Sequence, residues 1–215
     1  MGSQVLVTDE LHEYMVAHGM PLDEIASELV TETQALGGVS EMLTTADQAA
    51  LLTTLTRLVG ARRAVEIGTF TGFSALAISR GLPADGELIC LDVSDEWTSI
   101  GRRYWERAGV AEKIDLRIGD AHESAAKLEG EFDLAFVDAE KPGYIDYFEQ
   151  LVPKLRPNGL LLFDNTLAGG RVVGEQEGED DPVDRKEFNA HVAADDRVDV
   201  VILGIGDGLT LVRKR

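Results

Sequence analysis

The segment Glu66-Ile67-Gly68-Thr69-Phe70-Thr71-Gly72-Phe73-Ser74 decides the fold of this chain. It follows a strand-like run at residues 64–67 and leads into a helical pattern at residues 74–80, so it predicts a strand, a tight turn and a helix. The two glycines let the backbone pass close to a ligand, and the first N–H groups of the helix are free to bind it. The segment therefore predicts a nucleotide-binding turn with a carboxylate, although a purely structural turn is an alternative for this segment taken alone.

Strand-like and helix-like segments alternate after this turn. Strands are predicted at residues 64–67, 87–92, 114–118, 133–137 and 160–164, and helices at residues 74–80, 95–108 and 144–155. Ser94 is suited to begin the second of these helices, and Gly109 to end it. The apolar runs at 134–137 and 160–163 suit strands covered on both faces, as in parallel sheets. The alternation predicts a doubly wound α/β fold.

The two ends of the chain depart from this alternation. Apolar residues at helical spacing predict a helix around residues 22–30, and Thr45-Ala46-Asp47-Gln48 has the pattern of a capping box that opens a helix ending at Gly60. Near the carboxyl end, strand-like runs at residues 198–203 and 209–213 are joined by a glycine-rich segment, which predicts an antiparallel pair. We expect a single domain over residues 1–215, with residues 1–60 as a helical extension within it.

Composition narrows the possible partners and locations. The chain has 39 acidic and 20 basic residues among 215, a net charge of −19. Nucleic-acid binding depends on phosphate neutralisation, so nucleic acid is not an expected partner. The single cysteine, Cys90, rules out an internal disulfide, and no apolar run is long enough to predict a membrane span. With no signal-like start, these features predict a cytoplasmic protein. The acidic segment 174–184 is expected to be a solvated loop.

Residues that follow the second and third strands extend the nucleotide-binding prediction. Gly68 and Gly72 are four residues apart, which differs from the GxGxxG spacing of dinucleotide sites. Asp92 ends the second strand, where a carboxylate can accept both hydroxyls of a ribose. Ala121 follows the third strand, where an adenine edge would lie. Together these residues predict an adenosine cofactor without a long phosphate chain.

Asp138, Asp164 and Asn165 follow two further strands and offer oxygen ligands. Oxygen ligation by few protein groups suits Mg²⁺, and Mn²⁺ or Ca²⁺ could also enter. The four histidines match no zinc spacing. Lys141 lies beside this set. The alternative is that the two aspartates only cap the loops after their strands.

The combination of these motifs resembles the cation-dependent O-methyltransferases, the family of caffeoyl-CoA and catechol O-methyltransferases. The resemblance rests on residues 66–74, on Asp92 18 residues further on, on residues 137–141 and on Asp164-Asn165, and it extends from about Met42 to the closing segment 206–211. It implies a Rossmann-like class I methyltransferase with a seven-stranded, mostly parallel sheet and an antiparallel carboxyl-terminal pair. It also implies S-adenosylmethionine as cofactor, a divalent cation, usually Mg²⁺, and a homodimer.

Matched position by position, the resemblance assigns roles to ten residues. The cofactor contacts would be Met42, Glu66, Gly68, Ser74, Asp92, Ala121 and Asp138, and the metal ligands Asp138, Asp164 and Asn165. Lys141 would take the proton of the acceptor hydroxyl or stabilise the resulting oxyanion. The acceptor would be a small phenol with two adjacent hydroxyls. The chain departs from the family at Ala168, where a tryptophan is common, and we expect this change to open the acceptor pocket.

Other functions remain open at this stage. A tRNA hydroxyuridine O-methyltransferase of the same family would keep the chemistry and change the substrate, but the charge of −19 opposes it. An NAD-dependent oxidoreductase would need an unusual glycine turn. A non-catalytic binding module is the weakest alternative, because the metal and lysine positions are all retained.

Overall fold

The computed structural model describes residues 5–174 and 182–215, and the strands of this part of the chain form one seven-stranded sheet. The strands are β1 (Arg63–Ile67), β2 (Glu87–Asp92), β3 (Ile114–Ile118), β4 (Phe132–Val137), β5 (Leu155–Phe163), β6 (Val198–Leu203) and β7 (Leu209–Lys214). Their order is β3-β2-β1-β4-β5-β7-β6. The first five strands are parallel, and β7 is antiparallel to both β5 and β6. The predicted fold class is confirmed.

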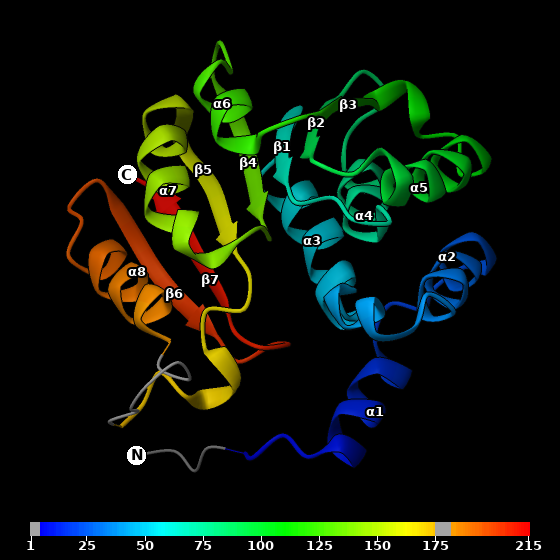
Figure 1. Ribbon diagram of the computed structural model, residues 1–215, viewed down its shortest axis with the longest axis horizontal. Helices are drawn as coiled ribbons and strands as arrows, with labels where there is room; N and C mark the ends of the chain where they lie inside the picture. The colour runs from blue at the N-terminus through cyan, green and yellow to red at the C-terminus, as the bar shows by residue number, and fades with distance from the viewer. Residues whose placement is uncertain (1–4, 175–181) are drawn as a thin grey trace.

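Helices cover both faces of the sheet, as Figure 1 shows. They are α1 (Asp9–His18), α2 (Glu24–Gln34), α3 (Ala46–Leu58), α4 (Phe73–Gly81), α5 (Asp95–Arg107), α6 (Ala121–Ala126), α7 (Tyr144–Leu151) and α8 (Val183–Ala193). Short 3₁₀ turns add η1 (Gly37–Met42), η2 (Ala111–Lys113), η3 (Lys141–Gly143), η4 (Val152–Lys154) and η5 (Ala168–Gly170). Helices α2 to α5 lie on one side of the sheet, and α6 to α8 lie on the other.

The sheet separates two apolar cores because successive strand residues point to opposite faces. Ala64, Leu88 and Phe136 pack toward α3 and α4, whereas Val65 and Ile89 pack toward α7 and α8. All five side chains are buried. This two-sided burial explains why the runs at residues 134–137 and 160–163 are apolar without interruption.

The structure corrects two boundaries and adds two helices. The helix predicted at 144–155 ends at Leu151, because Pro153 lies in the following 3₁₀ turn and lacks the N–H that a continued helix requires. Strand β5 then begins at Leu155 rather than at residue 160, and Phe132 pairs with Leu155 while Leu134 pairs with Leu160. The intervening residues 156–159 form an irregularity in the strand. Helices α6 and α8 were not predicted.

The predicted helix caps have different outcomes. Ser94 accepts a hydrogen bond from the Trp97 N–H at 3.2 Å, which confirms its role. Gly60 follows α3 with a φ of +63°, as expected of the residue after a helix. Thr45 precedes α3 but makes no side-chain capping bond, so the predicted capping box does not form. Gln48 lines a cavity instead.

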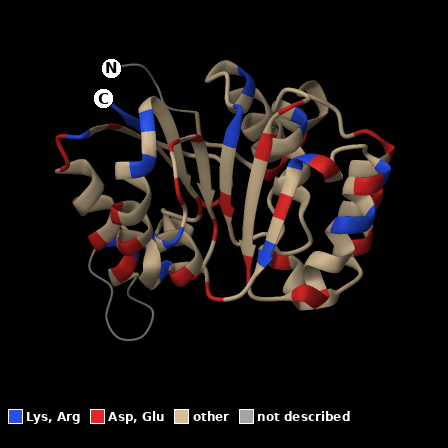
Figure 2. Ribbon diagram, turned by 90° about the horizontal axis from the view of Figure 1, so that it is seen from above, with Lys and Arg blue, Asp and Glu red and all other residues tan. Residues whose placement is uncertain are grey.

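The acidic character of the chain is spread over the surface. Figure 2 shows the sheet between its helical layers, with acidic residues on helices of both layers. Residues 175–181 of the predicted acidic loop lie outside the described residues. Within residues 5–174 and 182–215, no helix is both long and apolar enough to cross a membrane.

The order of the strands reverses between β1 and β4, and this creates a crevice at their carboxyl ends. Backbone hydrogen bonds continue beyond the strands there. The Gly68 N–H donates to the Leu91 carbonyl at 2.9 Å, and the Asp138 N–H to the Ile67 carbonyl at 2.8 Å. The Asp164 N–H donates to the Val137 carbonyl at 3.0 Å. These bonds fix the loops that follow β1, β4 and β5 beside one another.

Candidate active site

A cavity of about 680 Å³ opens at the carboxyl ends of β1, β2, β4 and β5. Nine of the ten residues predicted for the site line it, namely Met42, Gly68, Ser74, Asp92, Ala121, Asp138, Lys141, Asp164 and Asn165. The tenth, Glu66, is completely buried in β1 and is not part of the lining. The topology therefore brings together residues that are up to 123 positions apart in the sequence, from Met42 to Asn165.

The glycine turn after β1 requires both of its glycines. Gly68 has a φ of +85°, and a Cβ atom built there would lie 2.0 Å from the Asp138 carbonyl oxygen. Gly72 has a φ of +79°, and its Cβ would lie 2.4 Å from the Trp105 ring. Any side chain at residue 68 would push the β1 and β4 loops apart. Glycine at residue 68 thus allows the backbones of the β1 and β4 loops to approach each other closely.

We expect Gly68→Ala to disrupt the site through the backbone. The added methyl group would meet a carbonyl oxygen rather than a flexible side chain, and alanine is strained at this φ. The expected loss of unfolding free energy is at least about 2 kcal/mol, equivalent to a melting temperature lower by about 5 °C. Thermal denaturation of Gly68→Ala and of Gly38→Ala, where a Cβ meets nothing within 4 Å, would test this. Equal melting temperatures would contradict the argument.

Asp92 holds the same turn from the end of β2. Its Oδ2 accepts the N–H groups of Thr69 and Phe70, each at 2.8 Å, and its Oδ1 accepts the Ser94 N–H at 2.7 Å. The carboxylate is therefore fixed in one orientation. Oδ1 retains acceptor capacity, so the group can still receive a hydroxyl donor from the cavity.

Glu66 lies beneath the turn as a buried carboxyl group. Burial, the largest cause, raises its pKa to about 7, although the nearby hydroxyls of Ser74 and Thr69 act to lower it. The Cys90 thiol donates to Oε2 at 3.4 Å. Oε1 is buried and makes no hydrogen bond within the described residues. A buried acceptor without a donor fits a ligand that brings an N–H or O–H group to this end of the cavity.

The raised pKa of Glu66 predicts a pH-dependent stability. The folded state keeps the proton that the unfolded state releases above its ordinary value of 4.5, so stability falls as pH rises from 4.5 through about 7. The difference amounts to about 3 kcal/mol between the two limits. Glu66→Gln should match the wild type near pH 5 and be more stable at pH 8, in urea unfolding of the cofactor-free protein. A gap that stays constant from pH 5 to pH 8 would exclude this assignment.

The opposite end of the cavity gathers carboxylates and a lysine. The Lys141 Nζ donates to Asp138 Oδ1 at 2.9 Å and to the Tyr144 hydroxyl at 3.0 Å. The Tyr144 hydroxyl in turn donates to the Asp164 carbonyl at 2.9 Å. Burial and the nearby Asp138 raise the pKa of Asp164 to about 6. Two acidic groups are thus held close together in a largely buried place, which favours binding of a cation.

Asn165 completes this end of the cavity. It adopts a φ of +54°, a conformation that asparagine tolerates better than most residues, and its N–H donates to Asp164 Oδ1 at 2.8 Å. The turn leaves Asp164 and Asn165 together in the cavity wall. Two carboxylates and an amide oxygen form a donor set that suits a hard divalent cation.

Comparison with known proteins agrees with this geometry. A model of the O-methyltransferase family matches residues 16–215. Tricin synthase 1 of Oryza sativa subsp. japonica is 42% identical over 188 residues, which cover 80% of this chain and 75% of that protein. Caffeoyl-CoA O-methyltransferase 2 of Zea mays is 37% identical over 227 residues, which cover 98% and 84%.

The chain belongs to the O-methyltransferase family.

Solved structures extend the comparison to the cofactor. Methyltransferase PaMTH1 of Podospora anserina, solved with S-adenosylhomocysteine (SAH), matches with a TM-score of 0.88 and 27% identity, over 100% of both chains. The O-methyltransferase TomG of Streptomyces achromogenes, solved with S-adenosylmethionine (SAM), matches with a TM-score of 0.87 and 27% identity, over 95% of this chain and 96% of that one. The protein is a SAM-dependent O-methyltransferase, and this assignment replaces the NAD-dependent alternative.

Two residues of the O-methyltransferase site were missed by the sequence analysis. Gln48, in the first turn of α3, is 1% exposed and lines the cavity, and its Nε2 makes no hydrogen bond within the described residues. Its amide lies close enough to Asp164 to lower the pKa of that carboxyl group. Tyr144, which was assigned no role, is the hydroxyl that bridges Lys141 and the loop after β5. Neither residue belongs to a motif that predicts a binding or catalytic role, so the packing of α3 and α7 brings them to the site.

Ala168, where the family commonly has tryptophan, does not lie in the cavity wall as the sequence analysis expected. Ala168 is 2% exposed and lies in η5, outside the set of residues that line the cavity. The Arg171 Nε donates to its carbonyl at 2.9 Å. The expected opening of the acceptor pocket at this position therefore has no support from the geometry.

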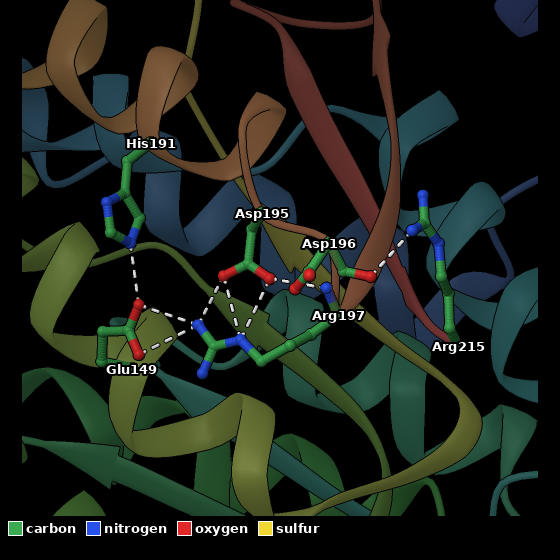
Figure 3. A network of polar contacts seen from close by, with 6 residues as sticks. All are labelled: Glu149, His191, Asp195, Asp196, Arg197 and Arg215. Carbon is green, nitrogen blue, oxygen red and sulfur yellow. Dashed lines mark hydrogen bonds and ion pairs between the residues drawn. The ribbon is translucent and has the colours of Figure 1, made fainter.

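A second acidic cluster of the O-methyltransferase lies away from the cavity (Figure 3). Ligand atoms of Glu149, His191 and Asp195 lie within 4.8 Å of one another. The Arg197 guanidinium already bridges the two carboxylates, and its Nη2 lies 2.9 Å from Glu149 Oε1. This arginine supplies the positive charge between the carboxylates, so we interpret the cluster as an ion-pair network that joins α7 and α8 to the start of β6.

Proposed function

We propose that this O-methyltransferase is metal-dependent and transfers the methyl group of SAM to one hydroxyl of a small catechol-type acceptor. The observation that carries the proposal is the pairing of Asp138 and Asp164 with Lys141 at one end of a cavity whose other end is the glycine turn. A catechol has two adjacent oxygens, which can reach a cation and a lysine together. The two ends of the cavity would hold this acceptor and the cofactor side by side.

The cofactor end would use residues whose local geometry suits SAM. Gly68 gives the backbone access, Asp92 would accept the ribose hydroxyls, and Glu66 would face a donor through its unpaired oxygen. The other contacts that we propose are Met42, Ser74, Ala121 and Asp138. SAM bears a positive sulfonium, and this excess of acidic groups favours it electrostatically.

The metal end would use Asp138, Asp164 and Asn165 as ligands, with Mg²⁺ as the preferred cation and Mn²⁺ or Ca²⁺ as substitutes. A bound divalent cation would supply Lewis-acid chemistry, lowering the pKa of a coordinated hydroxyl. The residues of the chain then have two tasks: to orient the acceptor and to manage its proton. Asp164 is fixed by Asn165, and Asp138 is fixed by Lys141.

Lys141 is the residue placed to handle the acceptor proton. Its Nζ is held between Asp138 and the Tyr144 hydroxyl, at the edge of the cavity. A neutral amine there would take the proton, and an ammonium there would stabilise the phenolate oxygen. Methyl transfer itself is a direct displacement that needs no covalent enzyme intermediate, so positioning and electrostatics account for the catalysis.

The remaining parts of the proposal concern the whole molecule. We propose a homodimer, a single domain over residues 1–215, and a cytoplasmic location. The resemblance to the family supports the homodimer. The single cysteine, which is buried, supports the cytoplasmic location. A tRNA substrate is disfavoured by the net charge of −19.

Methyl transfer from labelled SAM to a panel of catechols, with Mg²⁺ or with EDTA, tests the proposal. We expect turnover that EDTA abolishes and that Mg²⁺ restores. Matched monophenols serve as the control, because they lack the second oxygen and should react poorly. Cofactor binding without metal-dependent turnover of any catechol would refute the proposed acceptor class, and tRNA would then be the substrate to test.

A further inference from the structure

One wall of the cavity is held by three residues, Glu140, His122 and Tyr147, which we call the Glu140 clamp. The His122 Nε2 lies 2.7 Å from Glu140 Oε1, and the Tyr147 hydroxyl donates to the same oxygen at 2.8 Å. A carboxylate can only accept hydrogen bonds, so the proton of this imidazole is on Nε2. Two donors from two different helices therefore fix a single carboxylate oxygen.

The two donors of the clamp also pack on each other. The rings of His122 and Tyr147 are stacked, with centroids 4.1 Å apart and an interplanar angle of 8°. Gly143 lies against them, and a Cβ atom there would be 2.7 Å from the imidazole and 2.8 Å from Glu140 Oε1. A side chain at residue 143 would therefore push the His122 ring and the Glu140 carboxylate apart. The cluster joins α6, α7 and the loop after β4.

The clamp lies where the proposed metal and cofactor residues meet. Glu140, which lies between Asp138 and Lys141 in the sequence, lines the cavity. Ala121 lines it from the start of α6, and His122 is the next residue in the chain. Both hydrogen bonds of Glu140 reach Oε1, and Oε2 has no hydrogen bond to the described residues. One oxygen is thus anchored, and the other remains available as an acceptor.

We propose that His122 and Tyr147 are positioning residues for SAM that act through Glu140. The inference deepens the proposed function and rests on its placement of the cofactor in this cavity. SAM carries several N–H and O–H donors and a positive sulfonium, so a fixed carboxylate in the wall attracts it. Anchoring Oε1 reduces the freedom that Glu140 loses when the cofactor binds, and this raises affinity.

The test is SAH affinity, measured by calorimetry on the full chain. Tyr147→Phe and His122→Phe each keep an aromatic ring in the stack and remove one donor. We expect each to weaken SAH binding by about five- to tenfold, with a matching rise in the KM for SAM and little change in the acceptor KM. His122→Gln retains a side-chain N–H and should recover part of the affinity.

The control is the similar pair on the other side of α7. His191 lies 2.8 Å from Glu149, its side chain is exposed to about the same extent as that of His122, and neither residue lines the cavity. His191→Phe should change SAH affinity less than about twofold. In a Glu140→Ala background, His122→Phe and Tyr147→Phe should cause no additional loss, because their target is gone.

Two results would overturn the inference. One is an SAH affinity within about twofold of wild type for both clamp variants. The other is an undiminished loss in the Glu140→Ala background, which would mean that the rings act by packing alone. Catechol turnover by the wild type separates this test from the proposed function: a failed catechol assay with the expected SAH pattern refutes the acceptor and leaves the clamp intact.

Discussion

Asp164→Asn should abolish metal-dependent methyl transfer while the fold persists. Asparagine keeps the volume of the side chain and an oxygen that can accept the Asn165 N–H, but it removes one of two negative charges at the metal end of the cavity. Loss of a cation's contribution of several kcal/mol corresponds to a rate lower by about a thousandfold. Turnover at saturating Mg²⁺ and calorimetric titration with Mg²⁺ would measure both effects.

The matched control for this variant is Asp146→Asn. Asp146 is an exposed residue of α7 that does not line the cavity, so its replacement changes the net charge by the same amount. Its turnover and metal affinity should equal those of the wild type. If Asp164→Asn kept wild-type affinity for Mg²⁺, the proposed ligand set would be wrong, whatever the effect on turnover.

Lys141→Met is expected to lower kcat by about a hundredfold or more, with SAH affinity changed far less. Methionine occupies similar volume but cannot exchange a proton or stabilise an oxyanion. Asp138 and the Tyr144 hydroxyl would both lose their partner, so we include Tyr144→Phe as a comparison. That variant keeps the lysine and should lose about tenfold at most.

Lys141→Arg distinguishes the two tasks of this residue. A guanidinium retains the positive charge and does not release its proton in the accessible pH range. Recovery of most of kcat by arginine would favour oxyanion stabilisation, whereas a rate as low as that of Lys141→Met would favour proton transfer. A kcat of Lys141→Met within about threefold of wild type would falsify a catalytic role for Lys141.

The residues that sequence analysis located best are those at the ends of strands. Asp92, Asp138 and Asp164 each follow a continuous apolar run, and parallel strands place such residues along one edge. The role of Gly68 could also be predicted from the sequence, because glycine is the residue that fits a positive φ and a close contact with another backbone. Local patterns were enough to predict these positions, because the functional side chain and the strand or turn that positions it lie in the same short segment.

Other residues depend on packing between distant segments, which no local pattern reports. Gln48 has a helix-capping pattern, yet its side chain lines the cavity, because α3 packs beside the crevice. His122 and Glu140 meet only because α6 and the β4 loop lie side by side. The start of β5 was missed for a related reason: its first residue, Leu155, pairs with Phe132 across an irregular register that period-two patterns do not predict.

The way in which Asp92 holds the glycine turn has a consequence for the kinds of ligand that the fold excludes. In many nucleotide-binding folds, free amides at this turn form a nest for phosphate oxygens. Here two of those amides, from Thr69 and Phe70, are already saturated by a carboxylate of the protein itself. A pyrophosphate at this turn would lack these two hydrogen-bond donors and would lie beside the negative charge of Asp92. We therefore expect this turn to disfavour polyanionic nucleotides and to favour a nucleoside attached to a cation.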